Sequence, residues 1–411
     1  MRRLASIGVV LALAGLAAWL LPFCREQRHL YFNDYAYTKE EARQLDRHAD
    51  ILYAHGWQAE NRMDRPAAED LYRRAISRNA LHMDAWLRLA ELTAADGDVA
   101  GARRITAFCN QYIAPVLRWK WPHTLLAQNL GMEEILTANI NYLVARRTKL
   151  TDALNLLETH CQGRPAAALA ILEPENHPAY LQWAIRWKRL DAARAAWQAL
   201  PPGQRADSEL LSDYVHFLLA KEQFREAAAV WREETGIEGV TNGGFENETT
   251  QKGFDWRMGK DRSGHWDLRR DPGAGRQGGA ALRVRFDGQA NVSFHHLSQV
   301  VAVTPETPCR IRFWWRDKGL TTDQLPFVEV SGYRTKGLYV RGPMLEDARQ
   351  WRQMEIAFTP PAGCYAVMVR LRRKPSDRFD NKIRGSLWLD DVELQTDAGA
   401  PVRPVAAKWV P

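Results

Sequence analysis

Aromatic and basic side chains alternate with apolar ones in the C-terminal part of the chain, and their types suit the binding of a sugar. In the segment 310–316, Trp315 shares one face of a predicted strand with apolar residues, whereas Arg310, Arg312 and Trp314 fall on the other face. Flat aromatic rings stack on the apolar C–H faces of sugar rings, and guanidinium groups donate hydrogen bonds to hydroxyls. We therefore predict that Trp314, Arg312 and Arg310 contact a saccharide.

Three further aromatic residues are candidates for the same contact. Tyr333 continues the outward parity of a strand in which Val328 and Val330 point inward. Trp256 and Trp266 lie in a loop-rich segment before the regular strands. The alternative for each of them, and for Trp314, is packing at the rim of the sheet, because partly exposed aromatic rings also cover sheet edges.

Arginine is frequent at outward-facing strand positions. Its planar guanidinium binds carboxylate and phosphate groups with two parallel hydrogen bonds, so an acidic polysaccharide is a natural ligand for such a surface. The alternative is an ordinary solvated face, with the strands divided between two sheets. The arginines concerned are Arg283, Arg285, Arg310, Arg312, Arg370 and Arg372.

The elements that position these side chains are short strands between residues 242 and 397. Apolar and polar residues alternate in them with a period of two, which is typical of strands buried on one side only. Clusters of Gly, Pro, Asn and Asp separate the strands, and no long helical pattern lies between them. The pattern predicts an antiparallel β-sandwich or jelly roll.

The two ends of this region carry motifs. It opens with Asn-Gly-Gly-Phe-Glu at 242–246 and closes with Trp-Leu-Asp-Asp-Val at 388–392. Together, in this order and spacing, they resemble carbohydrate-binding modules of the family four and nine jelly-roll type. The resemblance implies glycan binding and a structural calcium ion held by Glu246 and Asp390, since calcium prefers carboxylate and carbonyl oxygens. The alternative is that backbone groups satisfy both carboxylates.

The middle of the chain, residues 39–236, has a helical pattern that repeats after thirty-four residues. Small residues let two helices approach closely, and large ones fill the groove of the next pair. This resembles the tetratricopeptide repeat and implies a small solenoid that binds a protein partner. Region 118–165 fits the repeat poorly. The first unit is marked by Leu52, Gly56, Ala68, Tyr72 and Ala75, and the second by Trp86, Ala90, Ala102, Thr106 and Cys109.

The N-terminal residues 1–24 form a basic and apolar segment. Two arginines precede about twenty uncharged residues, enough for one membrane-spanning helix. The arginine pair places the N-terminus in the cytoplasm by the positive-inside rule. We expect an uncleaved single-pass anchor in a bacterial inner membrane, with the rest of the chain in the periplasm; a cleaved signal peptide is the alternative. Residues 25–38 are predicted to be a linker and 398–411 a disordered tail.

Composition and motifs exclude several functions. The 411 residues carry a formal net charge of +7, with no run of basic residues that would indicate nucleic-acid binding. The motifs of zinc proteases, serine hydrolases, nucleotide-phosphate loops and dinucleotide-binding folds are absent, and no residue is marked as catalytic. Cys309 and Cys364 each begin a predicted strand, so a disulfide and two buried free thiols are both open.

The sequence therefore predicts a multidomain α plus β protein: an anchor, an α-solenoid and a β-sandwich. We expect a non-catalytic, membrane-anchored scaffold that binds a protein through its helices and a poly- or oligosaccharide, acidic or neutral, through its sandwich. Its expected role is in assembly or export of a surface or extracellular polysaccharide. Two alternatives stay open: a polysaccharide lyase or hydrolase on the jelly-roll fold, and a structural adaptor that binds no sugar.

Overall fold

A computed structural model describes residues 48–113, 117–205 and 207–396 of the chain. The described part divides into two compact units, one ending at Asn176 and the other beginning at His177. The predicted anchor, linker and tail lie outside the described residues. Within the described residues, no helix is long and apolar enough to cross a membrane.

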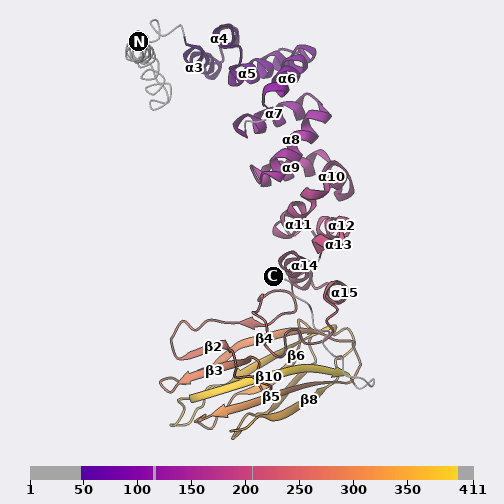
Figure 1. Ribbon diagram of the computed structural model, residues 1–411. Coiled ribbons are helices and arrows are strands. Elements are labelled where there is room, and N and C mark those ends of the chain that lie inside the picture. The colour runs from indigo at the N-terminus through magenta and orange to yellow at the C-terminus, as the bar shows by residue number, and fades with distance from the viewer. Residues whose placement is uncertain (1–47, 114–116, 206, 397–411) are drawn as a thin grey trace, which may run out of the picture. The chain divides into compact units, whose positions relative to one another are not determined.

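The first unit consists of helices that pair in chain order (Figure 1). The predicted repeat positions meet where the helices pair: Gly56 of α3 faces Tyr72 of α4 so closely that a Cβ at position 56 would lie 2.5 Å from the tyrosine ring. Asp64 caps α4 by accepting a hydrogen bond from the Ala67 amide at 3.2 Å. The helices are α3 (Ala49–Asn61), α4 (Arg65–Arg78), α5 (Met83–Ala95), α6 (Val99–Ile113), α7 (Leu117–Asn129), α8 (Glu133–Ala145), α9 (Leu150–His160) and α10 (Pro165–Ile171), followed by the 3₁₀ turn η1 (Pro174–Asn176).

The part of this unit that fits the repeat poorly has a polar chain in its core. Lys120 donates from Nζ to Asn139 Oδ1 at 2.9 Å, and the Asn139 amide nitrogen lies 2.9 Å from His123 Nδ1. His123 Nε2 lies 3.0 Å from the carbonyl oxygen of Thr106, which can only accept. The buried imidazole is therefore neutral, with its proton on Nε2, and burial lowers its pKa.

The second unit begins with α11 (His177–Arg186), α12 (Leu190–Ala199), α13 (Pro202–Arg205), α14 (Ser208–Ala220) and α15 (Phe224–Thr235). The last helix pair contacts loops of the β-sandwich that follows. The ring of Trp231 on α15 meets Phe254 edge to face with centroids 6.0 Å apart, and Lys252 forms an ion pair of 2.7 Å with Asp213 on α14. Gly253 has a left-handed φ of +54°, and a Cβ there would lie 3.3 Å from the Trp231 ring, so this approach requires glycine.

Two five-stranded antiparallel sheets form the sandwich, as the alternation predicted (Figure 1). Sheet A has the strand order β1-β4-β9-β6-β7, and sheet B has the order β2-β3-β10-β5-β8. The strands are β1 (Arg257–Met258), β2 (Trp266–Asp271), β3 (Ala281–Asp287), β4 (Phe294–Ala302), β5 (Cys309–Lys318), β6 (Phe327–Gly332), β7 (Tyr339–Met344), β8 (Arg352–Phe358), β9 (Ala366–Arg373) and β10 (Arg384–Thr396).

The core lies between the two sheets and follows the predicted parity. Trp315 of β5 points inward with its apolar neighbours, and Val328 and Val330 of β6 point inward from sheet A. Cys309 and Cys364 are both buried, and each thiol donates to a backbone carbonyl instead of forming a disulfide.

Candidate functional site

The predicted contact residues Trp314, Arg312 and Arg310 share the outer face of sheet B. Trp314 is half-buried, and the guanidinium carbon of Arg276 lies 4.5 Å from the centre of its ring. This cation–π contact covers part of the surface that a sugar would use. Arg312 donates from Nε to Glu355 at 2.8 Å, and Arg310 lies 3.9 Å from the same carboxylate, which therefore neutralises part of this face.

Tyr333 does not join this group. It follows β6 of sheet A, and its ring lies edge-on to Phe224 of α15 with centroids 5.7 Å apart. The neighbouring Arg334 donates to the carbonyl oxygen of Ala220 at 3.2 Å and pairs with Glu222. Tyr333 is thus part of the contact between the last helix pair and the sandwich, and its role as a sugar contact stays a prediction.

For Trp256 and Trp266 the predicted sugar contact is wrong, because both side chains belong to the core. Trp256 is 2% exposed, packs against Phe245 and donates from Nε1 to the Asn242 carbonyl at 3.2 Å. Trp266 is 8% exposed and meets Phe294 edge to face with centroids 5.0 Å apart. Both rings are buried, so these two aromatic residues fill the core of the sandwich instead, and Trp266 does so as the first residue of β2.

The predicted calcium ligands lie near each other around Gly244. A Cβ at that glycine would be 3.9 Å both from Asp390 Oδ1 and from Glu246 Cγ. Asp390 is buried and accepts from the Arg276 amide at 2.7 Å, and Glu246 accepts from the Ala280 amide with both oxygens at 3.1 Å. Burial raises the pKa of the Asp390 carboxyl, and the charges of its acidic neighbours raise it further.

A cation bound here would be held by Asp390 and Glu246, whose side chains both lie next to Gly244. Calcium takes six to eight oxygen ligands, so two side chains would supply only part of its shell. Within the described ranges, no group of three or more His, Cys, Asp or Glu side chains is placed to hold a metal ion. Backbone amides donate hydrogen bonds to both carboxylates, which is the alternative that the sequence left open. Calcium binding therefore stays a prediction.

The outer face of sheet A holds a polar cluster that the sequence interpretation missed. Glu329 of β6 lies between two inward-facing valines, so its side chain points outward, yet it is only 2% exposed. Two guanidinium groups of β9 reach its carboxylate, Arg370 at 3.3 Å and Arg372 at 3.4 Å. The hydroxyl of Tyr339 on β7 donates to the other carboxylate oxygen at 3.1 Å. We call Glu329, Tyr339, Arg370 and Arg372 the Glu329 cluster.

Strand pairing places this cluster at the centre of sheet A. Glu329 is paired with Arg370 on one side and with Arg341 on the other, and Arg370 is paired with Ser298. Ser298, Arg370, Glu329 and Arg341 therefore form one row across β4, β9, β6 and β7. Three outward arginines of this face, Arg341, Arg370 and Arg372, lie next to the single carboxylate of Glu329. The local charge of this face is therefore positive.

One member of the Glu329 cluster presents an exposed aromatic ring. Tyr339 is 56% exposed, and its hydroxyl bond to Glu329 fixes the orientation of the ring. Burial raises the pKa of Tyr339, and the hydrogen bond to Glu329 raises it further, so the phenol keeps its proton at neutral pH. An aromatic surface, a carboxylate acceptor and guanidinium donors therefore lie together on one face.

One signal in the sequence could have pointed to the cluster. Glu329 is an acidic residue between two valines, on the parity already read as outward. Its partners follow only from the pairing of β6 with β9, two strands that lie apart in the sequence. The arginine set of the sequence interpretation is accordingly split, with Arg370 and Arg372 on sheet A and Arg283, Arg285, Arg310 and Arg312 on sheet B.

Carbohydrate-binding modules are found among similar solved structures, and they match the C-terminal β region. A family 61 module in complex with β-1,4-galactotriose is 20% identical over 39% of this chain and 99% of its own, with a TM-score of 0.28. A family 16 module is 18% identical over 38% of this chain and 98% of its own, with a TM-score of 0.28. The family 22 xylan-binding domain from Paenibacillus barcinonensis is 16% identical over 38% of this chain and 94% of its own, with a TM-score of 0.24.

No protein-family model matches the chain, and no curated protein matches it. The resemblance of the helices to the tetratricopeptide repeat thus stays a prediction. We base the candidate site on the side chains of the two sheet faces.

Proposed function

We propose that the β-sandwich binds an acidic saccharide on the outer face of sheet A. The observation that carries this proposal is the Glu329 cluster: an outward carboxylate held by two guanidinium groups and a phenol, next to the exposed ring of Tyr339. A buried carboxylate is costly unless it is paired, so the fold holds these groups in a fixed arrangement. Fixed polar groups beside an aromatic ring are what recognition of a sugar requires.

Each group has a distinct task in this proposal. The ring of Tyr339 stacks on the C–H face of a sugar unit. The buried Glu329 carboxylate orients the groups that face the ligand, because it accepts from the Tyr339 hydroxyl and pairs with Arg370 and Arg372. The surplus positive charge of Arg341, Arg370 and Arg372 attracts carboxylate groups of the polymer, which guanidinium groups bind well.

The wider role is an extension of the sequence prediction. A membrane anchor at residues 1–24 would hold the chain at a periplasmic membrane surface, and the paired helices would bind a protein partner. A scaffold of this kind would keep a polysaccharide close to the machinery that assembles or exports it. The contact of α14 and α15 with the sandwich supports a joint action of helices and sugar site.

A polysaccharide lyase or hydrolase is the second candidate, and the convergence of a glutamate, a tyrosine and two arginines favours it. Two features weigh against it. A tyrosine that acts as a base needs a lowered pKa, whereas that of Tyr339 is raised. The Glu329 cluster also contains one carboxylate, whereas most glycosidases use two.

The structural adaptor is the third candidate. It predicts that Trp314 and Tyr333 are covered, and both are half-buried, with Tyr333 against α15 and Trp314 under Arg276. This candidate makes no use of the Glu329 cluster, and it predicts a folded protein that binds no glycan.

A polysaccharide array probed with the purified full-length protein tests the proposal, with acidic and neutral polymers side by side. Two matched variants distinguish the sheet faces. Glu329 pairs with two arginines on sheet A, and Glu355 pairs with two arginines on sheet B. We expect Glu329→Gln to lose binding to acidic polymers and Glu355→Gln to retain it. A folded wild-type protein that binds nothing supports the adaptor, and release of shortened chains from a bound polymer supports the enzyme.

A further inference from the structure

The loop between β9 and β10 combines a rigid base with a fully exposed aromatic ring. Phe379 is fully exposed, whereas Arg373, at the end of β9, is the largest side chain that is completely buried. Exposing a phenylalanine ring to water is unfavourable, because burial of such a side chain is worth about 1.5–3 kcal/mol. A loop that is held in place and still presents this ring points to a contact with a ligand.

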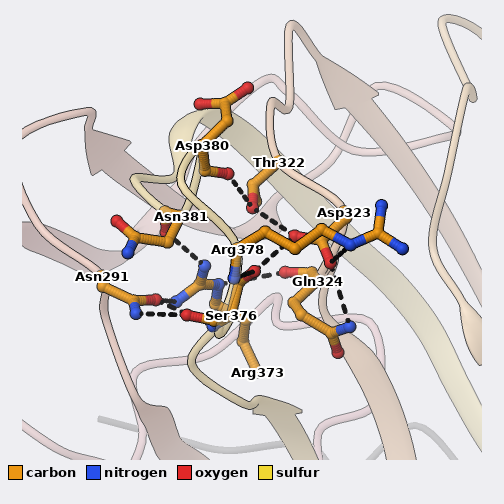
Figure 2. A network of polar contacts seen from close by, with 9 residues as sticks. All are labelled: Asn291, Thr322, Asp323, Gln324, Arg373, Ser376, Arg378, Asp380 and Asn381. Carbon is orange, nitrogen blue, oxygen red and sulfur yellow. Dashed lines mark hydrogen bonds and ion pairs between the residues drawn. The ribbon is translucent and has the colours of Figure 1, made fainter.

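Arg373 holds the base of the loop through carbonyl oxygens (Figure 2). Its guanidinium donates to the Gln324 carbonyl at 3.0 Å, to the Asn381 carbonyl at 2.9 Å and to Asn291 Oδ1 at 3.0 Å, and it also donates to the Val292 carbonyl. One buried side chain thereby joins three loops. Burial lowers its pKa, and the Asp323 charge works in the opposite direction.

The segment on the N-terminal side of Phe379 is held separately. Ser376 donates from its hydroxyl to Asp323 at 2.6 Å, and its amide donates to Asn291 at 3.0 Å. Arg378 pairs with Asp323 at 3.3 Å.

On the C-terminal side, Thr322 donates to the Asp380 carbonyl at 3.0 Å. The Asp380 carboxylate points away from the network (Figure 2). Fixed backbone on both sides of Phe379 reduces the entropy that the loop would lose on binding.

The loop stands at one end of the face that carries the Glu329 cluster. Arg372 of the cluster and Arg373 of the loop base are consecutive in β9. Roughly 10 Å along the strand separates Arg370 from Arg373, at a rise of about 3.3 Å per residue. A ligand that lies along β9 over Glu329 must therefore extend at least this far to reach the loop that carries Phe379.

We propose that Phe379 is an additional stacking subsite for long chains of the saccharide, an inference that rests on the proposed function. The chemistry beside the ring suits a sugar, because Arg378 and Asp380 are exposed and offer donors and acceptors for hydroxyls.

Isothermal titration calorimetry with acidic oligosaccharides of two to eight units tests this subsite in the full-length protein. The probes are oligogalacturonates, oligomannuronates and oligoguluronates. For Phe379→Ala we expect the wild-type Kd for the shortest oligosaccharide that binds and an about tenfold weaker Kd for the longest. Phe379→Trp should restore the dependence on length. Trp187→Ala, which removes an exposed ring on the helical part of the same unit, serves as the control.

The outcomes separate this inference from the proposed function. A Phe379→Ala protein with wild-type Kd values at every length overturns the subsite and leaves the site at Glu329 standing. An equal loss at all lengths also overturns it, because the ring would then act on the whole site. A wild-type protein that binds none of the oligosaccharides and no polymer on the array overturns the proposed function, and the subsite with it.

Discussion

Arg372 and Arg373 are adjacent in β9 and serve opposite sides of the strand. The Arg372 guanidinium lies 3.4 Å from Glu329 on the outer face, whereas Arg373 is fully buried and bonded to carbonyl oxygens. The alternation of side chains along a strand gives two identical residue types two different tasks. One arginine belongs to the candidate sugar site, and the other belongs to the fold.

This difference predicts that the same substitution has unequal effects on stability and on binding at the two positions. Arg373→Met leaves several buried carbonyl oxygens unpaired, and we expect the free energy of unfolding of the sandwich to fall by about 3 kcal/mol or more. Arg372→Met should lower the free energy of unfolding by only about 1 kcal/mol, because Arg370 still pairs with Glu329. It should also weaken saccharide binding, because it removes a guanidinium group from the site. Urea denaturation and calorimetry measure the two effects. Equal losses of stability would contradict the division of tasks.

A site on sheet A and a site on sheet B predict different effects of aromatic substitutions on the saccharide Kd. Tyr339→Ala should weaken saccharide binding about tenfold or more, since it removes both the exposed ring and a hydrogen bond to Glu329. Trp314→Ala should leave the Kd unchanged, because this ring lies on sheet B under Arg276. The measurement is a titration of each variant with the acidic polymer found on the array. The reverse result would move the site to sheet B, which carries the predicted contact residues Trp314, Arg312 and Arg310.

Salt should weaken binding if the positive face of sheet A recognises an acidic polymer. Exposed charges are screened over about 8 Å at 0.15 M ionic strength, so the Kd should rise steadily between 50 and 500 mM salt. An Arg341→Gln variant removes an exposed charge of this face and should show a shallower salt dependence. A Kd that does not change with salt would favour a neutral sugar instead.

Calcium should stabilise the sandwich if Glu246 and Asp390 hold it. A ligand that binds only the folded state raises stability by about 2.7 kcal/mol at a hundred times its Kd. Thermal unfolding of the full-length protein with calcium and with a chelator measures this shift. Glu246→Gln should abolish the response to calcium. Identical melting curves with ion and chelator would mean that backbone amides alone satisfy the two carboxylates.

Acid should destabilise the helical unit through His123. The pKa of this imidazole is lowered in the folded state, so the unfolded chain binds more protons once the pH drops below the unfolded value of about 6.5. Stability is therefore fully present above that pH and is lost as the pH falls toward the folded pKa. Denaturant unfolding followed between pH 7.5 and 4.5 measures the slope. His123→Gln should flatten it, and an unchanged slope would assign acid sensitivity to other groups.

The fold could be predicted from the sequence further than the site could. Alternation along β5 and β6 correctly placed Trp315, Val328 and Val330 in the core, because parity is a local property of a strand. Parity also placed Glu329 outward, but the pairing of β6 with β9 depends on contacts between distant segments. Trp256 and Trp266 were misassigned for a related reason. Trp256 precedes the two-residue strand β1, and Trp266 is the first residue of β2, so no run of alternation ahead of either residue indicated that it fills the core.

The contact between the last helix pair and the sandwich has a mechanical consequence. Trp231 meets Phe254, Phe224 meets Tyr333, and Lys252 bridges to Asp213, so several independent contacts fix the sandwich to α14 and α15. A polymer under tension that is held on sheet A would pass its load into these helices through side-chain packing, rather than through the short connecting segment alone. The force at which the polymer dissociates from the sugar site would then depend on residues that never touch the sugar.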